Sequence, residues 1–162
     1  MKTIPLTQGM FAMVDDEDYE FLNQYKWCVS KDRGIYYAQK AINRDGKKTT
    51  IKMHQLIIGY AKQYDIDHAD GDGLNNQRYN LRVCTHMQNN ANQRIPKNNK
   101  SGYKGVHWVN KRGKWRAEIK CGVIRKTIGQ YSTKEEAAIA YNMAASKLFG
   151  QYARPNEVRA GG

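Results

Sequence analysis

Four polar residues in the middle of the sequence have side chains that could together bind a metal ion and activate water. Asp67 and His68 are adjacent in "IDHADGDGLNN", and Asn80 and Asn89 follow in "YNLRVCT" and "QNNANQ". A carboxylate from Asp67 and an amide oxygen from Asn89 are hard ligands that suit Mg²⁺ or Mn²⁺, with water and phosphate completing the shell. His68 then remains available near neutral pH to take a proton from water. The pattern predicts a one-ion site for phosphodiester hydrolysis.

Short elements on both sides must bring these residues together. "IDHAD" predicts a brief strand, and the glycines at 71 and 73 supply a bend, without which Asp67 and His68 would point to opposite sides. "LRVC" predicts a second brief strand, and "THMQNNANQ" predicts a short helix that returns Asn89 to the same spot. The amide of Asn80 is expected to tie the polar loop to the second strand.

Two other interpretations of this stretch are open. A calcium loop would use Asp67, Asp70 and Asp72, but these miss the spacing of an EF-hand and no glutamate stands at the closing position. Spacing alone leaves a structural role of His68 in the loop as an equal alternative to a catalytic one.

Composition restricts the class of protein. The chain has 162 residues, 40% of them hydrophobic, which is room for one ordinary domain or two small ones. No apolar run approaches the roughly 18 residues of a membrane span, and the N-terminus lacks the apolar run of a secretory signal, so a cytoplasmic protein is expected. Cys28, Cys84 and Cys121 are far apart and form no CxxC pair, which predicts buried or half-buried thiols and neither disulfides nor a cysteine-based zinc site.

The positive charge is concentrated in one segment. The formal net charge is +12, yet residues 1–92 hold 12 Lys/Arg against 11 Asp/Glu, whereas residues 93–130 hold 11 against 1. Tyr103, Trp108 and Trp115 are interleaved with this basic segment. Such a local field attracts polyanions, above all nucleic acid, with a solubilising surface as the alternative.

Residues 1–53 predict a small antiparallel sheet. "MFAMV", "WCVS" and "IYYAQKAI" are strand-like, "DDEDYEFLNQY" is a short helix with acids in its first turn, and "NRDGKK" is an Asp-Gly hairpin turn before the strand "TTIKM". The segment carries no chemistry of its own. It is expected to brace the following module or to add DNA contacts through Lys40, Arg44, Lys47, Lys48 and Lys52.

Residues 103–156 predict a three-stranded sheet packed on one helix. The helix has a capping box from Thr133 to Glu136 and ends near Gly150. We expect a helix stripe formed by Ala137, Ala140, Ala144 and Leu148, with Tyr141 beside it, to lie on the sheet. In the second strand, period-two alternation turns Trp115, Ala117 and Ile119 toward the helix and leaves Lys114, Arg116, Glu118 and Lys120 on the open face.

The order of motifs resembles the HNH nuclease family, in its phage and mobile-intron (homing) branch. The matching pieces are "MHQLI", "IDHADGDGLNN", "YNLRVCT" and "QNNANQ". The resemblance implies a ββα-metal fold over residues 54–92, with Asp67 and Asn89 as ligands of one Mg²⁺ or Mn²⁺ and His68 as general base. In this branch an aspartate replaces the first histidine of other members as metal ligand.

The same resemblance implies roles for three further residues. Asn80 is the structural asparagine of the motif, and Arg82 helps to hold a phosphate. His54 matches a histidine ahead of the motif, as a buried residue at a helix start or an accessory DNA contact. Without CxxC pairs, the zinc-stapled variant of the family is excluded.

The C-terminal segment resembles the plant ethylene-response (APETALA-type) DNA-binding domain. The resemblance rests on "GYKGVHWVNKRGKWRAEIK", "IRKTIGQYSTKEEAAIAYNMAA" and "GQYARPN", and implies a sheet that docks in the major groove with the helix behind it. Lys104 and His107 stand where the plant domain usually has arginines, and Thr127 stands where it usually has a tryptophan. The base preference of the plant domain therefore does not carry over to this chain. The candidate DNA-binding residues are Lys104, His107, Arg112, Lys114, Arg116, Glu118, Lys120 and Arg125.

The expected protein is an α+β endonuclease of the homing type that acts on double-stranded DNA as a monomer or weak dimer. It is expected to bind neither a membrane nor zinc. Its expected segments are 1–53 as a bracing region, 54–92 as the nuclease module, 93–102 as a linker, 103–156 as the DNA-binding domain and 157–162 as a tail. Its expected location is the cytoplasm of a bacterial or phage-infected host cell. The alternative function is a non-catalytic, sequence-specific DNA-binding regulator with a degenerate nuclease module; an RNA-binding protein fits less well because the open face lacks stacked aromatics.

Overall fold

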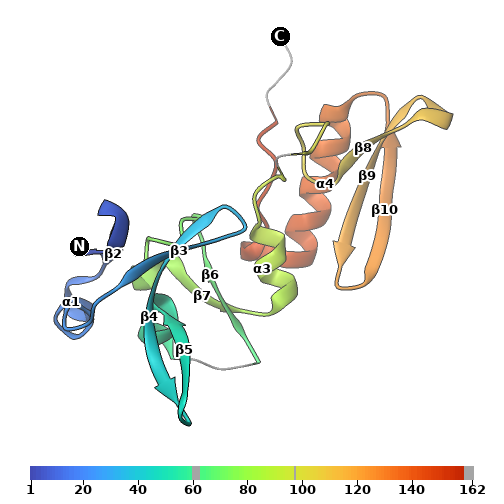
Figure 1. The fold of residues 1–162 in the computed structure, drawn as a ribbon. Coiled ribbons are helices and arrows are strands. Elements are labelled where there is room, and N and C mark those ends of the chain that lie inside the picture. The colour runs from blue at the N-terminus through green and yellow to red at the C-terminus, as the bar shows by residue number, and fades with distance from the viewer. Residues whose placement is uncertain (60–62, 97, 159–162) are drawn as a thin grey trace. The chain divides into compact units, whose positions relative to one another are not determined.

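The fold is α+β, as the sequence predicts, with small antiparallel sheets and a few helices (Figure 1). The computed structural model describes residues 1–59, 63–96 and 98–158. The chain forms two compact units, Met1–His86 and Met87–Gly162. Among the helices of the described residues, none is long and apolar enough to cross a membrane.

The first unit begins with a hairpin, a helix and a three-stranded sheet. Strands β1 (Lys2–Pro5) and β2 (Phe11–Val14) pair, and helix α1 (Asp16–Asn23) follows with three acids in its first turn. Strands β3 (Cys28–Asp32), β4 (Ile35–Arg44) and β5 (Lys47–Lys52) form the sheet in the order β3-β4-β5. The predicted Asp45-Gly46 turn is confirmed, with both residues at positive φ, as a tight hairpin requires.

The predicted nuclease module continues from this sheet. Helix α2 (Met53–Ile58) is followed by strands β6 (Asp65–His68) and β7 (Leu81–Cys84), which pair antiparallel. Residues 60 and 61, at the end of the predicted "HQLIIGYA" helix, lie outside the described residues. Helix α3 (His86–Asn92) carries the Asn-rich end of the motif.

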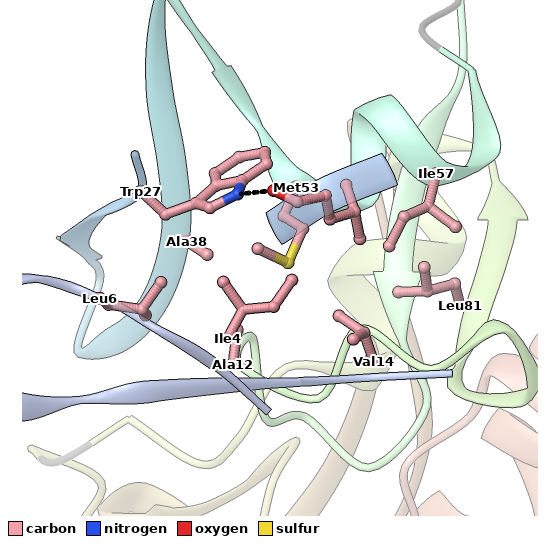
Figure 2. Close-up of a cluster of buried hydrophobic side chains, with 10 residues drawn as sticks. Ile4, Leu6, Ala12, Val14, Trp27, Ala38, Met53, Ile57 and Leu81 are labelled. Atoms are coloured by element: carbon pink, nitrogen blue, oxygen red, sulfur yellow. Dashed lines mark hydrogen bonds between the residues drawn. The ribbon is translucent and has the colours of Figure 1, made fainter. Parts of the chain in front are cut away.

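One hydrophobic core serves the whole first unit (Figure 2). Ile4 and Val14 from the first hairpin, Trp27, Met53 from α2 and Leu81 from β7 are all buried in it. The indole Nε1 of Trp27 donates a 2.9 Å hydrogen bond to the carbonyl oxygen of Leu22, so this buried polar group is satisfied. Residues 1–53 and the segment carrying the motif therefore share one core.

The second unit is a sheet with a helix on one face. Strands β8 (Val106–Val109), β9 (Lys114–Cys121) and β10 (Ile124–Tyr131) are ordered β10-β9-β8, and α4 (Lys134–Phe149) packs on the sheet. The predicted capping box is confirmed: Glu136 N donates to Thr133 Oγ1, and Glu136 Oε2 accepts from Thr133 N. Short 3-10 turns at Thr7–Gly9, Arg78–Asn80, Asn110–Arg112 and Gly150–Tyr152 complete the chain.

The predicted stripe on α4 is partly wrong. The helix buries Ala137, Ala138, Tyr141, Ala145 and Phe149. The predicted Ala140 and Ala144 are half-buried and pack against the same core, whereas Leu148 is 48% exposed. Phe149, one position further along the helix than Leu148, lies on the buried side in its place.

The cysteine prediction is also wrong at one position. Cys84 is buried and Cys121 half-buried, but Cys28 is exposed. Its neighbour Trp27 is buried in the core, and because successive residues of a strand point to opposite faces, Cys28 turns outward.

Candidate functional site

The Asp67–His68 pair lies at the end of β6, and both side chains are 5% exposed. In the β6–β7 register Asp67 is opposite Arg82 and His68 is opposite Leu81. Directly opposite residues share a face, and Arg82 forms an ion pair with Asp67 Oδ2. The hairpin thus brings the side chains of Asp67 and Arg82 together. His68, the next residue along the strand, has other side-chain neighbours.

His68 is enclosed by rings from two other elements. The His54 ring, in the first turn of α2, packs edge-on to it at 4.9 Å between centroids, and the Tyr37 ring of β4 lies at 5.8 Å. Gly73 closes this enclosure because a Cβ there would lie 2.4 Å from Tyr36 O and 2.5 Å from the Tyr37 ring. His54 is 6% exposed, so of its two predicted roles the structure shows a buried residue at a helix start. No sequence motif marks Tyr37 or Gly73 as neighbours of this histidine.

Burial determines the charge of both histidines. Desolvation lowers the pKa of His68, and the side chain of Asn76 and the nearby carboxylates only partly oppose this shift. Desolvation also holds the pKa of His54 well below its ordinary value, with the charges of His68 and Lys52 adding to the effect. Both rings are therefore neutral near pH 7, which is the form of His68 that can accept a proton.

Asn80 holds the polar loop between β6 and β7. Its Oδ1 accepts from Asp70 N at 3.0 Å, and its Nδ2 donates to Asp70 Oδ1 at 3.0 Å and to Asn75 O at 2.9 Å. Its backbone carbonyl accepts from Ala69 N at 2.9 Å. With 1% of its surface exposed, Asn80 fixes the path of the chain directly after His68.

Replacing this amide should destabilise the first unit. We expect Asn80→Ala to lower its free energy of unfolding by about 2 to 4 kcal/mol, since the buried partners lose their hydrogen bonds. Urea denaturation followed by the fluorescence of Trp27, the tryptophan of this unit, measures the change. Asn23→Ala, at an exposed asparagine that ends α1, is the control and should stay within about 0.5 kcal/mol of the wild type. Equal effects of the two substitutions would contradict this role of Asn80.

The N-terminal segment holds the far side of the same loop. Asn76 N donates to Met13 O at 2.8 Å, and Met13 N donates to Leu74 O at 2.9 Å, so β2 and the loop pair. Arg78 donates to both carboxylate oxygens of Asp18, at 2.7 and 2.8 Å. Sequence reasoning missed these partners because they lie about 60 residues apart in the chain.

Asp67 is a suitable ligand for a divalent cation. Its buried carboxylate is a hard anionic donor of the kind that Mg²⁺ and Mn²⁺ prefer. The described residues contain no group of three or more His, Cys, Asp or Glu side chains that could hold a metal. A single buried carboxylate fits an ion that keeps several water and phosphate ligands, as Mg²⁺ usually does.

Asn89, the other predicted ligand, lies on α3, and most of α3 packs within the second unit. Ala91 is buried in the core of that unit, and Met87 Sδ is 3.7 Å from Cys121 Sγ. Lys104 Nζ donates to Ala91 O at 2.5 Å and to Gln93 O at 3.0 Å. Lys104 therefore secures the C-terminal end of α3, although the sequence placed it among the DNA-binding residues.

The environment of Lys104 should be visible in its titration. Burial, together with the charge of Arg154, lowers the pKa of Lys104 from 10.5 to about 8. The unfolded state therefore binds more protons between these two values, so the free energy of unfolding of the second unit should rise with pH in this window. We expect the ε-methylene ¹³C resonance that disappears in Lys104→Arg to titrate near pH 8. A midpoint close to 10.5 for this resonance would contradict the prediction.

The open face of the second sheet carries all but one of the other predicted DNA-binding residues. In the register His107 lies opposite Arg116, Lys120 opposite Arg125, and Thr127 opposite Glu118. The opposite face is confirmed as core, since Ala117 and Ile119 are buried against α4. The residues that the structure places on the open face are His107, Lys114, Arg116, Glu118, Lys120 and Arg125.

Two of the predicted DNA-binding arginines differ in their surroundings. Arg112 is exposed in the turn between β8 and β9. Arg125 Nη1 pairs with Glu118 Oε1 at 3.3 Å, so the acidic residue positions a cation on the open face.

Comparison with known proteins identifies relatives of both units. Residues 55–91 match the HNH endonuclease family. A protein of Acanthamoeba polyphaga mimivirus named as an uncharacterized HNH endonuclease is 32% identical over 155 residues, which cover 93% of this chain and 77% of that protein. Protein 3.8 of Escherichia phage T7 is 36% identical over 93 residues, which cover 57% of this chain and 76% of that protein. An ethylene-responsive transcription factor of Arabidopsis thaliana is 34% identical over 100 residues, which cover 59% of this chain and 60% of that protein. No solved structure gives a significant match.

Proposed function

The chain belongs to the HNH endonuclease family, and on that basis we propose that it is a divalent-metal-dependent homing endonuclease that cuts double-stranded DNA. The observation that carries this proposal is the buried Asp67–His68 pair at the end of β6. A carboxylate ligand and a neutral histidine at adjacent positions supply the two groups that metal-assisted hydrolysis needs from the protein.

His68 acts in this proposal as the general base. Its buried ring is neutral near pH 7 and takes a proton from the attacking water, while the rings of His54 and Tyr37 and the loop tied by Asn80 keep it in place. Asp67 would hold Mg²⁺ or Mn²⁺, the ion for which the sequence also predicts Asn89 as a ligand. When bound, such an ion stabilises the negative charge that develops on the phosphate.

Arg82 has two tasks in the proposed site. It orients the carboxylate of Asp67 through their ion pair, and in this proposal its guanidinium also holds a phosphate oxygen of the substrate. One base and one ion suit the cleavage of one strand, so we propose that a monomer or weak dimer nicks DNA and leaves 5′-phosphate and 3′-hydroxyl ends.

In this proposal the open face of the second sheet binds the DNA duplex. Likeness to the ethylene-responsive factor supports this assignment, together with the cations at Arg116, Lys120 and Arg125. Likeness to a phage protein supports action inside a bacterial or phage-infected host cell. The same plant likeness favours the second candidate function, a sequence-specific DNA-binding regulator that does not cut.

Cleavage of a supercoiled plasmid library with a randomised insert separates the two functions. We expect nicked plasmid in Mg²⁺ or Mn²⁺ and none in EDTA, and sequencing of the nicked ends gives the site. Sequence-selective binding to the library without nicking in either metal would favour the regulator and reject the endonuclease.

A further inference from the structure

The outer part of the β4–β5 hairpin is a two-stranded ribbon with no core side. β3 pairs with β4 only from Ile35 to Gln39, whereas β5 pairs with β4 from Gln39 to Arg44, so β4 and β5 continue together past the end of β3 (Figure 1). All residues from Lys47 to Thr50 are exposed. A two-stranded hairpin is marginally stable by itself, so this extension adds little to the stability of the unit.

The ribbon is basic, although its unit as a whole is nearly neutral. Residues 40–52 hold five Lys/Arg and one Asp, against 12 Lys/Arg and 11 Asp/Glu in residues 1–86. The acidic residues are gathered at 15–20 and 65–72 instead. Such segregation of charge within one folded unit creates a local positive field at the ribbon.

Only part of this charge serves the unit itself. Lys40 Nζ lies 3.0 Å from the centre of the Tyr25 ring, and Lys52 Nζ lies 4.1 Å from that of Tyr37. Lys47 and Lys48 are exposed, and neither forms an ion pair within the part of the chain that the structure describes. These two lysines are available to a partner molecule.

The two lysines point to opposite faces of the ribbon. Lys47 is opposite Arg44 and Lys48 is opposite Asn43, and adjacent strand residues alternate between faces. Cations on both faces suit a ribbon inside a groove with phosphates on both walls, whereas a sheet lying flat on DNA needs them on one face only.

We propose that the β4–β5 ribbon is a second DNA-binding element, which enters the major groove and contacts phosphates of both strands through Lys47 and Lys48. The major groove, about 12 Å wide, admits a two-stranded β-ribbon. The proposal rests on the proposed function in one respect, namely that the polyanion is duplex DNA. It adds a DNA contact made by the first unit to the DNA contacts proposed for the sheet of the second unit.

The salt dependence of DNA binding tests each face of the ribbon. Lys47→Gln and Lys48→Gln, singly and together, are compared with wild type by fluorescence anisotropy on a random-sequence duplex in EDTA over a series of NaCl concentrations. Each single substitution should reduce the slope of log K against log salt by about 0.9, and the double variant should bind roughly thirtyfold more weakly at about 0.15 M salt. The control pair Lys2→Gln and Lys26→Gln removes the same charge from exposed lysines of the same unit and should leave the slope unchanged.

The outcomes separate this proposal from the nuclease assignment. A slope that changes for only one of the two lysines would reject insertion into a groove, and unchanged slopes for both would reject the ribbon as a DNA contact. The control variants Lys2→Gln and Lys26→Gln should nick plasmid at the wild-type rate. A protein that binds through the ribbon but never nicks would reject the endonuclease and leave this inference standing, whereas nicking with unchanged slopes would do the reverse.

Discussion

His68→Ala is expected to lower the rate of DNA nicking by about 10²- to 10⁴-fold, the usual contribution of a general base, while leaving DNA affinity unchanged. The ring is 5% exposed and neutral near pH 7 because burial lowers its pKa, so it is ready to accept a proton from water. Nicking rates at saturating DNA and anisotropy on the same duplex measure the two quantities separately.

The matched control for this experiment is His86→Ala. His86 is in the same unit but is exposed, with its Nδ1 2.9 Å from Asp65 Oδ2, and its loss should change the nicking rate little. His68→Gln, which fills more of the buried site, guards against loss of folding, and the urea midpoint of both variants shows whether they remain folded. Parallel loss of nicking and of binding in folded His68 variants would reject the general-base assignment.

Gly105→Ala is expected to unfold the second unit, with a loss of about 4 kcal/mol or more in its free energy of unfolding. Gly105 has a φ of +74°, and a Cβ there would lie 2.2 Å from the Tyr141 ring and 2.6 Å from Glu118 O. Tyr141 is the buried centre of α4, and Gly105 O accepts from Glu118 N at 2.8 Å, so neither neighbour can move away without breaking the contact of sheet and helix.

Gly113→Ala separates this steric effect from backbone strain. Gly113 also has a positive φ, +57°, but a Cβ there would have nothing within 4 Å. Its substitution should cost only about 1 to 2 kcal/mol, the penalty of a left-handed conformation. Trp108 and Trp115 report unfolding of this unit by fluorescence. Similar losses in the two variants would show that the close packing at Gly105 does not matter.

The sequence by itself determined most of the secondary structure and the order of the motif, whereas strand β1 (Lys2–Pro5) was not predicted. Capping at Thr133, the Asp45-Gly46 turn and the alternation around Ala117 are local signals, since each depends on residues within a few positions along the chain or on one repeating pattern. These signals were enough for the α+β class and for the placement of Asp67 and His68 at a strand end.

Only the tertiary structure decided which distant side chains surround those residues. The enclosure of His68 by Tyr37 and His54, and the pairing of Arg78 with Asp18, join elements that are far apart in sequence and leave no periodic trace. Lys104 shows the same limit: the resemblance to the plant DNA-binding domain made it a candidate DNA contact, whereas the fold directs its Nζ to carbonyl groups at the end of α3. Local patterns record the preferences of the backbone and of neighbouring side chains, whereas burial and the pKa values that follow from it depend on which elements pack together.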